Sequence, residues 1–186
     1  MSSSTAISSE TTLKNLITAF QGESNASAKY SAFAKKADED GYGRVASLFR
    51  AASRAEQIHA ANHLRVIEKM GGKTVAKIEP VHIGTTPENL KTAIAGEEYE
   101  RDVMYPGFIK EAEAQANTPA IRTFQWALEA EAEHARMYTN ALKHLDKQRT
   151  KTVFYVCVVC GYTTDDPDMM RCPVCNTPKE KFERIE

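Results

Sequence analysis

The sequence predicts a mainly α-helical protein in which four long helices form a bundle and a small metal-binding domain of β-strands and turns follows. Three observations predict this fold class. Four long segments place apolar residues at helical spacing. A short motif of glutamate and histidine recurs on two of these segments, and all four cysteines lie between positions 157 and 175.

Glycine and proline residues predict where the helical segments begin, end or are interrupted. Gly71 and Gly72 follow the second segment. They predict its end, because glycine adopts the backbone conformations that end a helix at low cost. Pro87 and Pro119 each follow a threonine, a pattern typical of helix starts. Pro106 lies inside the third segment, where its missing N–H predicts a kink or break. The helices are expected over residues 12–38, 44–70, from 86 onward, and 118–146.

The composition excludes several classes of protein. The 186 residues have a net charge of −1, so no overall field favours nucleic acid or an anionic membrane. No apolar run approaches the roughly 20 residues that a membrane span needs. Residues 1–11 are polar and lack the basic and apolar regions of a signal peptide, so we expect a disordered tail there. A cytoplasmic protein without nucleic-acid or membrane partners is therefore expected.

Two domains are predicted from a change in composition near residue 148. Residues 12–147 are expected to form the helical bundle, and residues 148–186 the metal-binding domain. Residues 153–164, "VFYVCVVCGYTT", are rich in β-branched and aromatic residues and predict a β-hairpin. A segment this short cannot bury enough apolar surface to fold alone, so a metal ion is needed to stabilise it.

The helical region contains an internal repeat. "AEQIHA" at 55–60 recurs as "AEAEHA" at 130–135, and "QGES" at 21–24 parallels "AGEE" at 95–98. Each half thus has a helix with one glutamate and then a helix with an E-x-x-H motif. The glutamates are 33 residues apart in the first half and 34 in the second. Antiparallel packing of such helices brings all four positions to one level of the bundle.

The repeat predicts a site for two metal ions. The side chains expected to converge are Glu23, Glu56, His59, Glu97, Glu131 and His134. Four buried carboxylates would be very costly without cations, and two divalent ions balance their charge. One glutamate from each of two helices and E-x-x-H from the other two is typical of carboxylate-bridged di-iron bundles. Iron or manganese suits these ligands better than calcium.

One residue breaks the symmetry of the repeat. Glu100 lies three residues after Glu97 on the same helix face, whereas the first half has Ala26 at the equivalent place. Glu100 is therefore a seventh candidate ligand. It indicates adjustable coordination at one of the two ions.

Three further residues lie near the expected ligands. Tyr30 and Tyr105 are either donors of hydrogen bonds to ligating carboxylates or ordinary core aromatic residues. His63 lies one turn beyond His59. A surface or core role is favoured for His63, with an approach to the site as the alternative.

The second metal site is predicted by two C-x-x-C pairs separated by eleven residues. Its ligands are Cys157, Cys160, Cys172 and Cys175. Such clustered thiolates are typical of a tetrahedral zinc or iron site in a reducing compartment, and not of a disulfide framework. Zinc would leave the helical metals without an evident source of electrons, so iron is favoured.

These motifs resemble the rubrerythrin family. The resemblance also includes "GES" at 22–24 and "GEEYERDVMYP" at 96–106, and it spans residues 22–175. It implies a ferritin-like four-helix bundle followed by a rubredoxin-like domain, with two iron ions in the bundle and one in the four-cysteine site of each subunit. It also implies a head-to-tail homodimer, or a higher homo-oligomer, with one subunit's thiolate iron near the other's di-iron site.

The resemblance further implies an activity. Members of the family reduce hydrogen peroxide to water, with electrons entering through the rubredoxin-like iron from an upstream reductase or rubredoxin, linked to NAD(P)H. Such a peroxidase would serve in oxidative stress defence. By analogy, Glu100 and His59 would exchange at one iron with its redox state. Glu100, Tyr30 and Tyr105 are the candidate proton donors, with Glu100 favoured.

Two other functions are consistent with the same motifs. A ferroxidase would use the same bundle to oxidise Fe(II), although the thiolate iron would then have no evident purpose. A zinc-ribbon binding or scaffolding protein would hold purely structural metals. Seven candidate ligands exceed the roughly four that a structural site needs, which argues against the scaffold.

Overall fold

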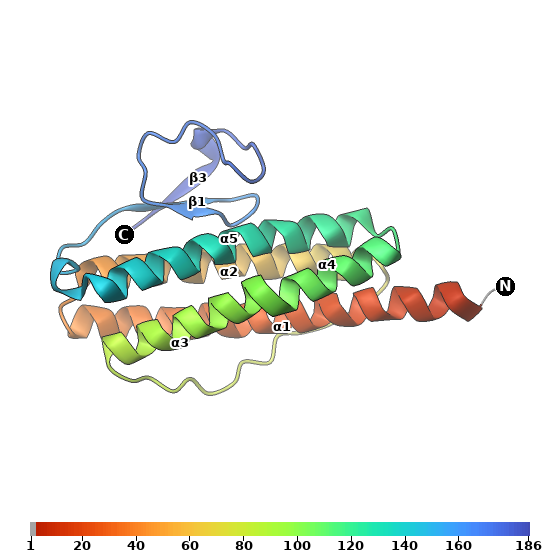
Figure 1. The fold of residues 1–186 in the computed structure, drawn as a ribbon, viewed down its shortest axis with the longest axis horizontal. Helices are drawn as coiled ribbons and strands as arrows, with labels where there is room; N and C mark the ends of the chain where they lie inside the picture. The colour runs from red at the N-terminus through yellow and green to blue at the C-terminus, as the bar shows by residue number, and fades with distance from the viewer. Residues whose placement is uncertain (1–2) are drawn as a thin grey trace.

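Four long helices form the body of the molecule, and a small domain lies on one side of it (Figure 1). This computed structural model describes residues 3–186. The helices are α1 (Ser3–Glu39), α2 (Gly43–Lys69), α3 (Thr86–Tyr99), a π-helical segment η1 (Glu100–Met104), α4 (Tyr105–Ala114) and α5 (Thr118–Lys143). The expected four-helix bundle is confirmed, with α3, η1 and α4 together forming its third helix.

The start of the first helix differs from the expectation. Helix α1 begins at Ser3 and not near Thr12, so it extends through most of the segment expected to be a tail. The reason is that residues 3–11 contain no glycine or proline that would end a helix. Met1 and Ser2 lie outside the described residues, and the disorder expected for these two residues stays a prediction.

A long crossover connects the two halves of the bundle. Residues 70–85 run back along the bundle between α2 and α3, so these two helices point the same way (Figure 1). Two amide side chains of α1 bind the crossover's backbone. Gln21 donates to the carbonyl of Val75 at 2.5 Å and accepts from the N–H of Lys77 at 2.9 Å, while Asn25 accepts from the N–H of Glu79 at 2.8 Å. These bonds replace the secondary structure that the crossover lacks.

The expected break near Pro106 takes the form of the π-helical segment η1. The N–H of Tyr105 donates to the carbonyl of Glu100, a π-type bond to the fifth residue back. Glu97 and Tyr105 are eight residues apart, whereas Glu23 and Tyr30 in the first half are seven apart. The wide π turn absorbs this extra residue, so Tyr105 keeps the helix face that Tyr30 has.

Two hydrophobic clusters fill the bundle on either side of the expected ligands. One cluster includes Tyr30, Phe49 and Tyr138, and the other includes Leu16 and Phe124. Along α1 and α2, the glutamates of the repeat fall between the residues of the two clusters. The polar side chains at this level are thus closed off from both ends by apolar residues.

The small domain, residues 148–186, is called the four-cysteine domain below. Its strands are β1 (Phe154–Cys157), β2 (Thr163–Thr164) and β3 (Phe182–Ile185), in the order β2-β1-β3. Antiparallel pairing of β1 with β2 confirms the expected hairpin, whereas β3 was not expected. Phe154 and Val156 are buried in the hydrophobic cluster of the bundle. Strand β1 therefore fixes the four-cysteine domain onto the helices.

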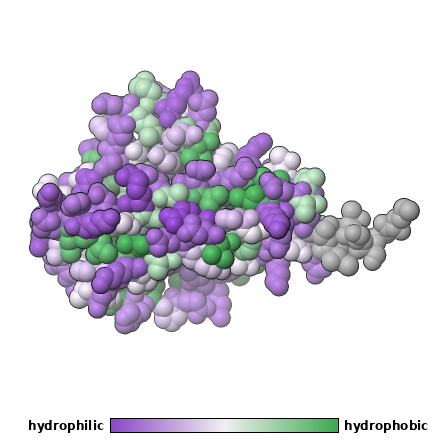
Figure 2. Space-filling model, in the orientation of Figure 1, coloured by the Kyte–Doolittle hydropathy of each residue, from purple (hydrophilic) through white to green (hydrophobic). Residues whose placement is uncertain are grey.

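The face drawn in Figure 2 is mostly hydrophilic, with hydrophobic residues scattered among polar ones. Over residues 3–186, none of the helices combines the length and the apolar character that crossing a bilayer would need.

Candidate metal centres

The six expected ligands of the bundle come together in its core. Helix α1 supplies Glu23, α3 supplies Glu97, and the E-x-x-H motifs lie on α2 and α5. All six side chains are at most 1% exposed. Their ligand atoms form two groups, within each of which every atom lies within 4.8 Å of the others. The groups are Glu23, Glu56, His59 and Glu131, and Glu56, Glu97, Glu131 and His134.

The two groups share a pair of carboxylates, Glu56 and Glu131. His59 Nδ1 lies 2.8 Å from Glu56 Oε2 and 2.9 Å from Glu131 Oε1. His134 Nδ1 lies 2.8 Å from Glu131 Oε2 and 3.4 Å from Glu56 Oε1. Each shared carboxylate thus presents one oxygen to each histidine. This is the arrangement that two ions bridged by two carboxylates require.

The atoms of this cluster fit metal ions better than they fit one another. Among the described residues, buried side-chain atoms without a hydrogen-bond partner include Glu23 Oε2, both oxygens of Glu56, Glu131 Oε1 and His59 Nδ1. Buried polar atoms are nearly always paired, so five unpaired ones at one place need an explanation. They lie close together yet are not aligned for hydrogen bonds. Cations between them would satisfy all five.

The electrostatics of the cluster support the same interpretation. Burial, together with the neighbouring carboxylates, holds the pKa values of Glu23 and Glu97 well above the ordinary range. Burial also opposes the charge on Glu131, yet His59 and His134 outweigh it and hold the pKa of Glu131 at about 2. Without cations the cluster therefore retains protons, and metal binding would displace them.

Glu100 lies beside this cluster and outside its two groups. It is on η1, next to Gly22, where an added Cβ would lie 4.0 Å from Glu100 Oε1. Glu100 is partly exposed, yet loss of hydration around its carboxyl group and the charges of Glu131 and Glu56 raise its pKa to about 8. Its role as a seventh ligand stays a prediction.

Each unshared glutamate accepts a hydrogen bond from a tyrosine of the other half of the repeat. Tyr30 donates to Glu97 Oε1 at 2.5 Å, and Tyr105 donates to Glu23 Oε1. Both tyrosines are at most 1% exposed. Of the two roles left open for them, the structure shows the hydrogen bond to a carboxylate. Whether they supply protons stays a prediction.

His63 lies in the core next to the cluster, so the expected core role is confirmed and the alternative of an approach to the site also holds. It is fully buried, and its Nε2 is 3.2 Å from the hydroxyl of Tyr105 and 3.8 Å from Glu23 Oε1. Its Nδ1 is 3.1 Å from Thr123 Oγ1. Burial and the nearby His59 lower the pKa of His63 to about 3. Thr123 was missed because nothing in its local sequence marks it.

The four cysteines form the second centre. Their sulfurs all lie within 4.8 Å of one another. In each C-x-x-C pair the residue after the second cysteine, Gly161 or Asn176, has a positive φ, 81° and 60° respectively. Its N–H donates to the carbonyl of the first cysteine at 2.9 Å in both pairs. Two such turns bring four thiolates together as a tetrahedral metal site requires.

The four-cysteine domain touches both histidines of the cluster. His59 Nε2 lies 3.0 Å from the carbonyl oxygen of Cys160, which can only accept a hydrogen bond. His134 Nε2 lies 3.1 Å from the hydroxyl oxygen of Thr163, whose hydrogen is donated to the carbonyl of Gly161 at 3.1 Å. Both imidazoles therefore have their hydrogen on Nε2, which leaves Nδ1 to face the carboxylates and bind a metal ion.

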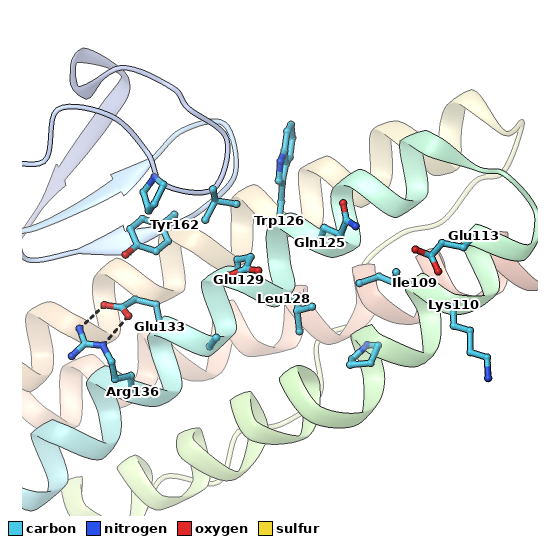
Figure 3. Close-up of a pocket in the computed structure, with 14 residues that line it drawn as sticks. Ile109, Lys110, Glu113, Gln125, Trp126, Leu128, Glu129, Glu133, Arg136 and Tyr162 are labelled. Atoms are coloured by element: carbon cyan, nitrogen blue, oxygen red, sulfur yellow. Dashed lines mark hydrogen bonds and ion pairs between the residues drawn. The ribbon is translucent and has the colours of Figure 1, made fainter.

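A surface groove also lies between the four-cysteine domain and the helices. Its volume is about 1040 Å³, and its lining includes Trp126 of α5 and Tyr162 of the four-cysteine domain (Figure 3). Trp126 packs against the buried cysteines, while Glu133 and Arg136 form an ion pair at 2.5 Å along α5. None of the eleven expected ligands named above lines this groove. The groove therefore borders the four-cysteine site without exposing a ligand of either metal centre.

Comparison with known proteins agrees with this geometry. The rubrerythrin family model matches residues 14–142, and the model of the rubrerythrin rubredoxin-like domain matches residues 155–183. The chain belongs to the rubrerythrin family. The ferritin-like bundle and the rubredoxin-like domain implied by the sequence resemblance are thereby confirmed.

Relatives within the rubrerythrin family cover nearly the whole chain. Nigerythrin of Nitratidesulfovibrio vulgaris is 38% identical over 97% of this chain and 88% of its own length. Rubrerythrin of Porphyromonas gingivalis is 33% identical over 97% of this chain and 93% of its own. The structure of nigerythrin in a mixed-valence state has a TM-score of 0.87 at 37% identity, covering 93% of this chain and 86% of that one.

A bacterioferritin shares only the fold. The di-iron bacterioferritin of Desulfovibrio desulfuricans has a TM-score of 0.71 at 24% identity, over 76% of this chain and 84% of its own. Family and geometry together establish the cofactors of this rubrerythrin-family chain. They are two iron ions at the glutamate and histidine cluster and one iron at the four cysteines.

Proposed function

We propose that this chain is a peroxidase that reduces hydrogen peroxide to water, with electrons entering through the iron of the four-cysteine site. The observation that supports this most strongly is the position of His59. Its Nδ1 faces the bridging carboxylates, and its Nε2–H donates to the carbonyl of Cys160 at 3.0 Å. One side chain thus connects the two metal centres of one chain. A redox centre joined so directly to the cluster has an evident use as its electron source.

The residues that would hold the metals are those placed together by the fold. Glu23, Glu56, His59, Glu97, Glu131 and His134 would hold two irons, and Cys157, Cys160, Cys172 and Cys175 the third. When bound, the irons supply the two electrons that reduction of one peroxide molecule consumes. The protein itself excludes water, since all six bundle ligands are at most 1% exposed.

Protons must reach the oxygen atoms of peroxide as electrons do. In the metal-free cluster the pKa of Glu100 is raised to about 8, so this carboxyl group can hold a proton and act as an acid. The hydroxyls of Tyr30 and Tyr105 already donate to Glu97 and Glu23. We propose Glu100 as a proton donor to peroxide. Each tyrosine holds a carboxylate in place, and both remain candidate donors.

A ferroxidase is the second candidate. The ferritin-like fold, shared with a bacterioferritin at a TM-score of 0.71, suits it. However, a ferroxidase has no evident need for a thiolate-iron site whose backbone contacts a histidine of the cluster. The peroxidase therefore explains more of the chain. Its electrons would come from an upstream reductase or rubredoxin, linked to NAD(P)H, and it would act in defence against oxidative stress.

Replacement of one cysteine tests the proposal. In Cys172→Ser, loaded with iron and supplied with an electron donor, we expect catalytic peroxide consumption to stop. A single reduction of peroxide by the pre-reduced cluster should remain. Metal analysis of both proteins is the control, because the cluster must keep its two irons. Full multiple-turnover activity in Cys172→Ser would contradict the electron relay.

A further inference from the structure

A chain of hydrogen bonds runs from Thr123 to the metal cluster through four helices. Thr123 of α5 lies 3.1 Å from Nδ1 of His63 on α2, and Nε2 of His63 lies 3.2 Å from the hydroxyl of Tyr105 on α4. Tyr105 in turn donates to Glu23 of α1. These contacts are buried and continuous, and they lead only to the cluster.

The chain has one direction. With metal bound, Glu23 is a carboxylate and can only accept, so the hydroxyl of Tyr105 donates its hydrogen to it. The oxygen of Tyr105 then accepts from Nε2–H of His63. A neutral imidazole with its hydrogen on Nε2 accepts at Nδ1, where the hydroxyl of Thr123 is the donor. Every group therefore donates toward Glu23.

In the part of the chain that the structure describes, the other half of the repeat has no such chain of hydrogen bonds. Tyr138 corresponds to His63, since each lies four residues after the histidine of its E-x-x-H motif, and Leu48 corresponds to Thr123, eight residues before the motif's glutamate. The hydroxyl of Tyr138 is buried without a partner among the described residues. Tyr30, the counterpart of Tyr105, packs against the ring of Tyr138 at 5.6 Å. Among residues 3–186, the tyrosine on the Glu23 side is thus continued by further buried hydrogen-bonding groups, whereas Tyr30 on the Glu97 side is not.

We propose that Thr123, His63 and Tyr105 form a proton wire that delivers protons to the Glu23 side of the cluster. This rests on the proposed peroxidase function. Reduction of one hydrogen peroxide to two waters takes up two electrons and two protons. Both protons must reach a cluster whose six expected ligand side chains are at most 1% exposed. Thr123 is 4% exposed, whereas His63 and Tyr105 are fully buried, so protons enter the wire at Thr123.

One transfer along the wire shifts three protons by one position. As the hydroxyl proton of Tyr105 moves to the Glu23 carboxylate, Tyr105 takes the Nε2 proton of His63. His63 takes the hydroxyl proton of Thr123 at Nδ1, and Thr123 recovers a proton from solvent. The wire itself stays neutral, and Glu23 becomes a carboxylate again when it passes the proton to an oxygen atom of peroxide. His63 must return its proton from Nδ1 to Nε2 before the second proton can pass.

An isosteric substitution tests the wire. Thr123→Val keeps the shape of the side chain and removes the donor to His63. We expect the pre-reduced, iron-loaded variant to react with hydrogen peroxide about tenfold more slowly, with a larger solvent isotope effect in D2O, because a positioned proton relay contributes at least this much. Thr123→Ser should restore the rate. Tyr138→Phe, the matched change in the other half, should stay within about twofold of wild type.

A second measurement does not depend on the reaction. Nitrogen-15 NMR of histidine in the zinc-loaded full-length chain reports which ring nitrogen of His63 is protonated, with His63→Leu identifying the signal. The wire requires hydrogen on Nε2 and none on Nδ1. Hydrogen on Nδ1 would reverse the chain and overturn the proposal, even if Thr123→Val does not fold.

The outcomes separate this inference from the proposed function. If wild type reacts rapidly and Thr123→Val reacts equally fast with an unchanged isotope effect, the wire is wrong and the peroxidase stands. If wild type itself fails to react with peroxide, the proposed function is wrong and the wire's role in it falls with it. A slower variant with the Nε2 tautomer in wild type supports both.

Discussion

At the scale of single residues, the cluster depends on neighbours supplied by other helices. Glu23 and Glu97 each accept a hydrogen bond from a tyrosine of the opposite half of the repeat. The two histidines are oriented by a carbonyl and a hydroxyl of the four-cysteine domain. These contacts hold ionisable groups in a core where, without metal, burial would keep several of them protonated.

The stability of the metal-free chain should therefore fall as pH rises from about 5 to 8. Glu23, Glu97 and Glu100 have raised pKa values when folded, and that of Glu100 is about 8. His59 and His134 also have raised pKa values, because the surrounding carboxylates outweigh burial. The folded state thus binds more protons than the unfolded state across this range, and each kcal/mol lost lowers the melting temperature by about 2–4 °C.

Thermal unfolding of the full-length chain with and without metal measures this effect. The zinc-loaded or iron-loaded chain is the control and should respond much less, because the cations replace the protons. A metal-free melting temperature that rises steadily from pH 5 to 8 would contradict the assignment of raised pKa values.

The bundle ligands and the cysteines could be predicted from sequence, whereas the residues around them could not. A repeated E-x-x-H motif and paired C-x-x-C motifs have fixed spacings, and these spacings determine which side chains point the same way. Thr123 has no such signal, since its contact with His63 depends on how α5 packs against α2. His63 lies on the same face of α2 as His59, yet only the fold shows that it contacts the hydroxyl of Tyr105.

At the scale of elements, irregular segments place the functional groups. The π-helical segment η1 contains Glu100. Its wide turn absorbs one extra residue, so Tyr105 points toward the cluster as Tyr30 does. Proline predicted an irregularity there, although the sequence did not show that it would be a π turn. Strand β3 was not predicted because "FERI" is short and half charged, so its pairing with β1 depends on the folded four-cysteine domain.

Gly161 offers a test of the contact between the two domains. Its φ is +81°, and an added Cβ would lie 2.2 Å from His59 Nε2 and 3.2 Å from the carbonyl of Ala55. Gly161→Ala should therefore push the four-cysteine domain away from α2. We expect electron transfer from the thiolate-bound iron to the cluster to slow by about tenfold or more, since misplacement by an ångström has effects of this order.

Stopped-flow spectroscopy of the thiolate-iron absorption measures this rate. The static spectrum of Gly161→Ala is the control and should be unchanged, because the four cysteines remain. Transfer at the wild-type rate would show that the contact between His59 and Cys160 is not the route.

At the scale of the whole molecule, both redox centres of one chain lie side by side. The family resemblance predicts a head-to-tail dimer in which one subunit's thiolate iron lies near the other's di-iron site. In this structure the four-cysteine domain instead contacts the cluster of its own chain, through His59 and His134. The dimer stays a prediction, and electrons need not cross between subunits.

Mixed oligomers distinguish the two routes. Cys172→Ser removes the relay and Glu131→Ala removes a shared carboxylate of the cluster, so each variant alone should be inactive. If electrons pass within one chain, co-expression of the two variants should recover almost none of the peroxidase activity. Recovery of about a quarter or more of wild-type activity, normalised to iron, would show transfer between subunits, because mixed pairs then hold one complete route.

The most direct test of the central claim is a single anaerobic reaction. The fully reduced, iron-loaded protein is mixed with enough hydrogen peroxide to oxidise all three irons, and the thiolate-iron absorption is followed by stopped flow beside a dioxygen-saturated sample. The peroxidase account predicts that the colour of the oxidised thiolate-bound iron appears rapidly with peroxide and slowly with dioxygen. A faster response to dioxygen, or a four-cysteine site that never develops colour, would contradict it.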